Sequence, residues 1–214
     1  MKQVRQTEYS RCRDKFQKYF RAVPKVNSKT GRSSTVIRLG MYTDFVKEIS
    51  SCSILESEPE VKVLLLVLYS TGIRISEALR LKVGQVNIQK RRITQIKLSK
   101  KRRDFYMDKP IHPQALEKLA QFLEGKGSNE NLFPNIADRF QARRRIRAYL
   151  GDLTTHDTRH SFISRAVNEG SAKKEKYTTA ELAKMCGFER LENATTYLNV
   201  ETDVLFDEMF DEVA

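Results

Sequence analysis

The sequence predicts a mainly α protein with a small antiparallel β-sheet, an α+β class, on three observations. Apolar residues recur at helical spacing over much of the 214-residue chain. A strongly apolar stretch begins at Pro59 and ends at Gly72, residue types that typically start and stop a buried helix. Two alternating segments, RRITQIKLS (91–99) and RRDFYM (102–107), flank the basic turn Lys100–Lys101 and predict a β-hairpin.

The remaining elements follow from the same periodicities. Helical spacing predicts one helix from Tyr9 to Val23 and another over Val36–Ile49. The polar stretch Pro24–Thr35 between them contains glycine and proline and is typical of a linker. The segment ISEALRL (75–81) predicts a short second helix after the buried one, and helical patterns return from Pro113 onward.

Charge is large and unevenly placed. Lysine and arginine number 39 against 27 acidic residues, and the net charge of +12 favours a nucleic acid as partner. No aromatic signature of an RNA-binding sheet is present, which disfavours RNA. No apolar run reaches the roughly 18 residues of a membrane span, and no signal peptide opens the chain. Three scattered cysteines predict reduced thiols in a cytoplasmic protein without a metal site.

Three polar segments each have an ordinary and a functional interpretation. Arg74 follows a helix stop and can either pair with Glu77 at the surface or bind two phosphate oxygens. In THDTRHSF (155–162), His156 and Arg159 share one face of a helix capped by Thr155, whereas His160 points elsewhere. This segment is either a capped helix with a satisfied histidine or a phosphate clamp beside a proton carrier. Tyr197, after a glycine turn, is either a core residue or a nucleophile.

Taken together, the three segments resemble the conserved boxes of the tyrosine recombinases, the phage integrase and Xer family. The family's first box, TGLR-x-SE-LxxL, is matched by Thr71–Leu81, and its second, HxLRHxFA, by His156–Phe162. Its third, LLGH followed nine residues later by a tyrosine, is matched by Met185–Phe188 and Tyr197. The resemblance covers roughly Ser51–Val200 and implies the tyrosine recombinase catalytic-domain fold.

The resemblance implies a role for each matched residue. Arg74 and Arg159 would bind the non-bridging oxygens of the scissile phosphate and stabilise a pentacoordinate transition state, without metal or cofactor. His156 would orient the nucleophile or exchange a proton with it. Tyr197 would attack phosphorus, leaving a 3′-phosphotyrosyl link and a free 5′-hydroxyl. The implied activity is a site-specific recombinase or integrase, with telomere resolution, type IB topoisomerase-like relaxation and a DNA-binding accessory role as alternatives.

A hairpin lysine would protonate the leaving 5′-oxygen. Lys101 or Lys100 fits best if Pro110-Ile111 matches the family's segment after the hairpin, and Lys97 is a further candidate. Further DNA contacts are expected from the arginines of the basic runs, Arg102, Arg103, Arg143, Arg144 and Arg145.

One box position departs from the family. Phe188 stands where the family has a second histidine or a tryptophan, and a phenyl ring donates no hydrogen bond to phosphate. The loss of one such donor slows catalysis about 10²-fold unless His160 or another group replaces it. Glu77 is a further supporting residue, beside Arg74.

The two ends of the sequence differ in charge and in expected role. Residues 1–35 are predicted to form a basic helical extension and linker, a remnant of a core-binding domain, and residues 36–214 the catalytic domain. An apolar stripe within Val204–Val213 predicts an amphipathic acidic tail helix that docks on its own domain or on a neighbouring protomer. The family resemblance implies double-stranded DNA as partner and self-association into dimers and a tetramer on DNA.

Overall fold

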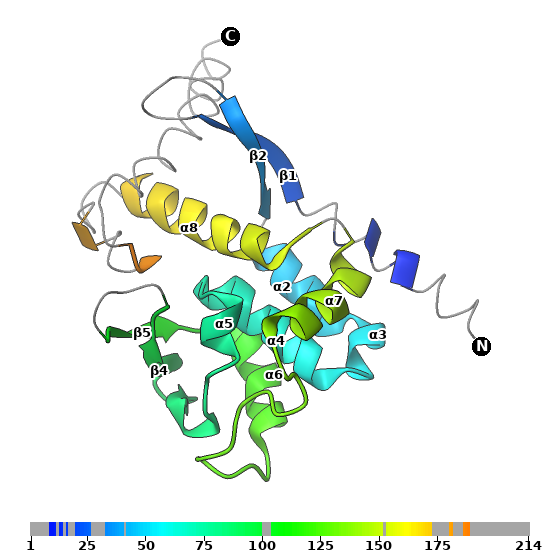
Figure 1. Cartoon of the computed structure of the whole chain (residues 1–214), viewed down its shortest axis with the longest axis vertical. Coiled ribbons are helices and arrows are strands. Elements are labelled where there is room, and N and C mark those ends of the chain that lie inside the picture. Colours follow the sequence, from blue (N-terminus) through cyan, green and yellow to red (C-terminus); the bar gives the residue numbers. More distant parts are fainter. Residues whose placement is uncertain are drawn as a thin grey trace.

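The computed structural model describes residues 9–11, 13–14, 16, 20–26, 33–40, 42–99, 104–151, 153–172, 180–181 and 186–188. The centre of the fold is helix α4 (Pro59–Thr71), and every residue after Pro59 is buried. Helices α2 (Tyr42–Ser51), α3 (Ser53–Glu56), α5 (Ile75–Ala78), α6 (Pro113–Leu123), α7 (Arg139–Leu150) and α8 (Thr155–Ala172) all contact α4. Figure 1 shows α8 crossing one end of this helical body.

The termini of α4 match the sequence prediction. Proline occupies its first turn, where no backbone donor is needed, and Gly72 caps its end in the left-handed conformation at φ 63°. Two charged residues inside the apolar run are buried with partners. Glu60 accepts hydrogen bonds from the backbone and side-chain nitrogens of Asn135, and Lys62 donates to the carbonyl of Ser50 and to the Glu56 carboxylate.

A three-stranded antiparallel sheet lies beside α5, in the order β3 (Val86–Asn87), β4 (Arg92–Lys97), β5 (Tyr106–Pro110). A 3₁₀ turn, η1 (Val83–Gln85), leads into β3. The predicted hairpin is therefore confirmed as β4–β5, and β3 adds a strand that the sequence pattern did not indicate. The register shifts between Ile93 and Ile96, and Gln95 adopts a positive φ of 51° at this bulge. Both isoleucines are consequently buried although they are three residues apart.

The region before α2 differs from the prediction. Residues Phe20–Val26 and Ser33–Gly40 form an antiparallel hairpin, β1 and β2, and β2 lies against α8 (Figure 1). The predicted helix is thus wrong for Phe20–Val23, and the predicted linker is wrong where it overlaps either strand. The helix expected from Val36 starts only at Tyr42. Adjacent β-branched residues at Val36–Ile37 favour a strand, and their apolar spacing imitates a helical stripe.

The fold class agrees with the sequence prediction, a mainly α protein with a small antiparallel sheet. The division at residue 35 stays a prediction, and β2 runs across that position. Within the described part of the chain, no helix is long and apolar enough to cross a membrane.

Candidate active site

Arg74 is held at the start of α5 by the buried carboxylate of Glu77. The Arg74 backbone nitrogen donates to Glu77 Oε2 at 2.7 Å, and its Nη1 donates to Oε1 at 2.9 Å. The same Oε1 accepts from the backbone nitrogen of Ser99, just after β4, at 2.7 Å. The Glu77 side chain is 0% exposed and that of Arg74 is 29% exposed. The expected pair exists, but it is a buried anchor that also fixes the hairpin, not a surface ion pair.

Arg159 joins three segments that are distant in the sequence. From α8, its Nη1 donates to the carbonyl of Gly72, and its Nη2 donates to the carbonyl of Cys186 at 3.0 Å. The residue is 5% exposed, and its guanidinium carbon lies 5.9 Å from the centre of the Phe188 ring. Gly72 precedes Arg74 by two residues, so both predicted arginines lie at the loop that ends α4. A guanidinium held in a fixed orientation can bind phosphate oxygens through its remaining N–H donors.

The start of α8 holds both histidines. Thr154 is the cap, because its hydroxyl oxygen accepts from the backbone nitrogens of His156 at 3.2 Å and Asp157 at 3.3 Å. The Asp157 carboxylate accepts in return from the Thr154 backbone nitrogen at 2.7 Å, which completes a capping box. The cap is therefore one residue earlier than the predicted Thr155.

His156 is exposed, whereas His160 is buried one turn later. Their ring centres lie 4.4 Å apart in an edge-to-face arrangement. The prediction that His160 points elsewhere is wrong, because residues four apart share a helix face. His160 therefore supports the ring of His156 from behind. Only His156 of this pair is open to a ligand.

The candidate lysines and the nucleophile are placed unequally. Lys97 is exposed and binds Asp104 across the hairpin at 2.8 Å, a hydrogen bond that raises the pKa of Lys97. Lys100, Lys101, Arg102 and Arg103 lie outside the described residues, as do Tyr197 and the segment Val204–Val213, for which the sequence predicts a helix. Among the residues that are described, no cluster of three His, Cys, Asp or Glu could hold a metal ion.

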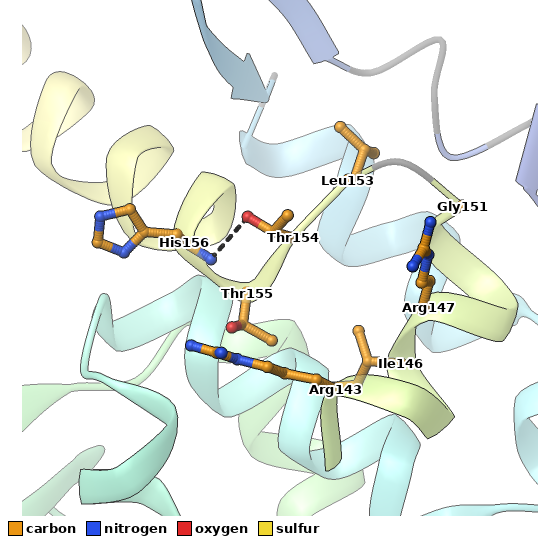
Figure 2. A pocket seen from close by; sticks show the side chains of 8 residues that line it. All are labelled: Arg143, Ile146, Arg147, Gly151, Leu153, Thr154, Thr155 and His156. Carbon is orange, nitrogen blue, oxygen red and sulfur yellow. Dashed lines mark hydrogen bonds between the residues drawn. The ribbon is translucent and has the colours of Figure 1, made fainter. Parts of the chain in front are cut away.

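The arginines of α7 that the sequence predicts to contact DNA have different surroundings. Arg143 and Arg147 line a pocket of about 500 Å³ together with Thr154, Thr155 and His156, as Figure 2 shows. Arg144 is exposed beside them. Arg145 instead binds the Glu58 carboxylate at the start of α4 at 2.9 Å. A basic surface thus borders His156, and Arg145 helps to attach α7 to the central helix.

Sequence reasoning missed one charged residue of the site, Lys109. It lies on β5, is only 1% exposed, and its Nζ is 4.9 Å from the centre of the Phe162 ring on α8. Burial lowers the pKa of Lys109 to about 8; Arg159 and Arg74 also lower this pKa, whereas Cys186 and Glu77 raise it. The available signal was a lysine at an inward position of an alternating strand, in register with the buried Ile93.

Comparison with known proteins places this geometry in a family. The model of the phage integrase family matches residues 41–203, most of the chain. The chain belongs to the phage integrase family. Within it, tyrosine recombinase XerC of Herpetosiphon aurantiacus is 27% identical over 199 residues, which cover 84% of this chain and 60% of that protein.

Solved structures of the family share the fold. The crystal structure of XerA recombinase matches with a TM-score of 0.56 and 19% identity, over 81% of this chain and 63% of that one. XerH site-specific recombinase, bound to palindromic difH substrate in a post-cleavage complex, matches with a TM-score of 0.56 and 16% identity. That match covers 87% of this chain and 56% of XerH. This chain has the tyrosine recombinase catalytic-domain fold and spans about three fifths of the length of these relatives.

Proposed function

We propose that this chain is the catalytic part of a site-specific DNA recombinase that cleaves and rejoins strands through a 3′-phosphotyrosyl intermediate on Tyr197. The observation that carries the proposal is the meeting of Arg74 and Arg159 at the end of α4, each held by acceptors of the chain. Family membership and the net charge of +12 support it. The fold match to XerH bound to palindromic difH substrate also supports the proposal, and the substrate that we propose for this chain is double-stranded DNA.

In the proposed reaction, the two arginines bind the non-bridging oxygens of the scissile phosphate. Their charge stabilises the transition state more than the ground state, because a pentacoordinate phosphorane carries one more negative charge than a phosphodiester. The exposed ring of His156, supported by His160, orients or exchanges a proton with the nucleophile. The bond energy stays in the phosphotyrosyl link, so rejoining needs no ATP, and the charge stabilisation uses no metal.

The leaving 5′-oxygen takes its proton from a lysine of the β4–β5 hairpin. Lys101 and Lys100 are the preferred candidates. Lys97 is the third, and its bond to Asp104 has to break before it can reach a substrate. The Glu77 carboxylate connects this hairpin to Arg74 through the Ser99 backbone. Substrate binding at the arginine is therefore coupled to the position of the hairpin end.

DNA-backbone contacts are assigned to the exposed Arg143 and Arg144 of α7, with Arg102 and Arg103 of the hairpin turn. Recombination joins two duplexes, so we propose dimers on each site and a tetramer at synapsis. We also propose a cytoplasmic location, associated with the nucleoid or, if the chain is virus-encoded, in the host cytoplasm. Residues 1–35 are proposed as a separate basic extension. The acidic tail within Val204–Val213 is proposed to dock on its own domain or on a neighbouring protomer.

The decisive experiment selects a site and tests the chemistry together. The protein is incubated with a pool of nicked duplexes of random sequence, denatured, and the covalently attached DNA is sequenced. A nick lets the short cleaved fragment diffuse away, which traps the adduct. Wild type should give one enriched sequence linked through a 3′-phosphate, and Tyr197→Phe should give no adduct while it binds DNA with nearly unchanged affinity. An adduct on the Tyr197→Phe variant would move the nucleophile elsewhere, with Tyr177 as the next candidate.

One observation favours a second candidate, a DNA-binding accessory protein without turnover. The ring of Phe188 lies beside Arg159, where the family resemblance leads us to expect a hydrogen-bond donor. Such a protein would bind duplexes of the pool but would give no covalent adduct with any of them. The same experiment therefore separates the two functions.

A further inference from the structure

Lys109 is a charged side chain that the proposed reaction does not yet use. It is 1% exposed at the inward face of β5, and no matched family box contains it. Burying an ammonium group is costly unless surrounding groups stabilise it. A position in register with the fully buried Ile93 would ordinarily hold an aliphatic side chain. The presence of lysine there requires an explanation.

Its surroundings are those of the phosphate site. The Phe162 ring faces its Nζ from α8 at 4.9 Å. The charged and titratable groups that influence its pKa are Cys186, Arg159, Glu77 and Arg74, which come from the segment 186–188, from α8, from α5 and from the cap of α5. Among the described residues, Lys109 thus shares the site with two other cations, Arg74 and Arg159, and one carboxylate, Glu77, which is an excess of positive charge.

The turn Cys186–Phe188 packs against the β4–β5 hairpin that carries Lys109. A Cβ atom added to Gly187 would lie 3.3 Å from Leu98 Cδ1 and 3.5 Å from Met107 Sδ, so the turn Cys186–Phe188 packs on β5 and on the residue that follows β4. The carbonyl of Cys186 binds Arg159 at 3.0 Å. Lys109 and Met107 project from the same side of β5, so Lys109 lies on the side of the strand against which the turn that carries Phe188 packs.

We propose that Lys109 is a positioning residue of the phosphate site, a buried cation that acts through Arg159 and adds positive charge to a site where Phe188 offers no hydrogen-bond donor. Repulsion between the two cations keeps the Arg159 guanidinium on the side of the Gly72 and Cys186 carbonyls. The ammonium charge also stabilises the doubly charged transition state more than the singly charged diester. With a pKa of about 8, the group is mainly protonated at pH 7. The inference rests on the proposed recombinase function.

The test measures single-turnover cleavage of the selected nicked duplex at saturating protein. Lys109→Met removes the charge and keeps an unbranched apolar chain. Lys109→Gln removes the charge but keeps a hydrogen-bonding group, so a folding defect of one variant does not decide the result. The matched control is Lys62→Met, which removes another buried lysine, 2% exposed, from α4, where it binds Glu56 and Ser50.

Both Lys109 variants should cleave about 10- to 100-fold more slowly than wild type at pH 7, with less than a threefold change in DNA affinity. Lys62→Met should lose stability and keep its cleavage rate. The ratio of wild-type to Lys109→Met rates should fall towards one as the pH rises from 8 to 10, because wild-type Lys109 then loses its proton. Equal rates for wild type and both Lys109 variants, or a ratio that does not depend on pH, would overturn the inference.

A sulfur-substituted substrate separates this role from that of a leaving-group acid. A thiolate leaves without a proton, so a 5′-bridging phosphorothiolate restores the rate of a variant that lacks the acid. The Lys109 variants should stay slow on this substrate, and full rescue would show that Lys109 is the acid instead. If wild type itself forms no adduct, the proposed function fails, and that outcome is distinct from all of these.

Discussion

Replacing Glu77 by glutamine tests how the site is held together. The carboxylate is fully buried and accepts three hydrogen bonds, two from Arg74 and one from Ser99. Glutamine keeps one oxygen and turns the other acceptor into a donor. In its better orientation the amide oxygen still accepts from Arg74 Nη1 and Ser99, and its NH₂ group faces the Arg74 backbone N–H. One buried N–H then loses its acceptor.

The cost follows from these contacts. An unsatisfied buried N–H costs about 1–3 kcal/mol, and each remaining bond loses roughly half its strength when the acceptor becomes neutral. We therefore expect Glu77→Gln to lower the free energy of unfolding by about 3 kcal/mol. Because the Arg74 guanidinium then has a neutral acceptor in place of an ion pair, it is held less firmly at the phosphate position, and cleavage should slow by about 10²-fold.

Urea denaturation gives the stability, and the single-turnover rate, measured where each variant is fully folded, gives the catalytic effect. Glu58→Gln is the control, because Glu58 also binds an arginine, Arg145, and the hydroxyl of Tyr149, but lies at the start of α4. It should lose about 1 kcal/mol and keep its cleavage rate. A Glu77→Gln protein as stable as wild type would refute the burial argument. One that is destabilised but cleaves normally would show that Glu77 supports the fold only.

Three further predictions concern the end of α4, the arginines and the tail. Gly72→Ala should lower the free energy of unfolding by about 2–4 kcal/mol in thermal or urea melts, because φ is +63° and the new Cβ would lie 2.3 Å from Phe162 Cδ1; a neutral effect would contradict this geometry. Arg74→Ala and Arg159→Ala should each slow adduct formation by at least about 10²-fold while filter binding shows DNA affinity changed far less, and equal losses would mark them as ordinary phosphate contacts. Deletion of Thr202–Ala214 should weaken cooperative assembly on paired sites in gel-shift titrations while one protomer still binds its half-site, and unchanged assembly would exclude docking in trans.

Local sequence signals determined the central helix and the hairpin. A proline at the start, a glycine at the end and an unbroken apolar run leave α4 few alternatives, and alternation with a basic turn marks β4 and β5. The same signals misled before residue 42, where apolar residues of a strand pair fit a helical stripe. A strand is stabilised by the strand with which it pairs, and the periodicity of one segment contains no information about that partner.

For the candidate site, the sequence determined the kinds of residue and their order along the chain, because the boxes around Arg74 and Arg159 are local patterns. Only the tertiary structure decided that both arginines meet at the loop after α4, since the acceptors of Arg159 are the carbonyls of Gly72 and Cys186. It also decided that Lys109 faces inward. The bulge at Gln95 shifts the register by one residue and sets Lys109 opposite Ile93. The identity of a residue says almost nothing about which backbone carbonyls it will contact or about the register of its strand. Such features are therefore decided only when distant segments pack together.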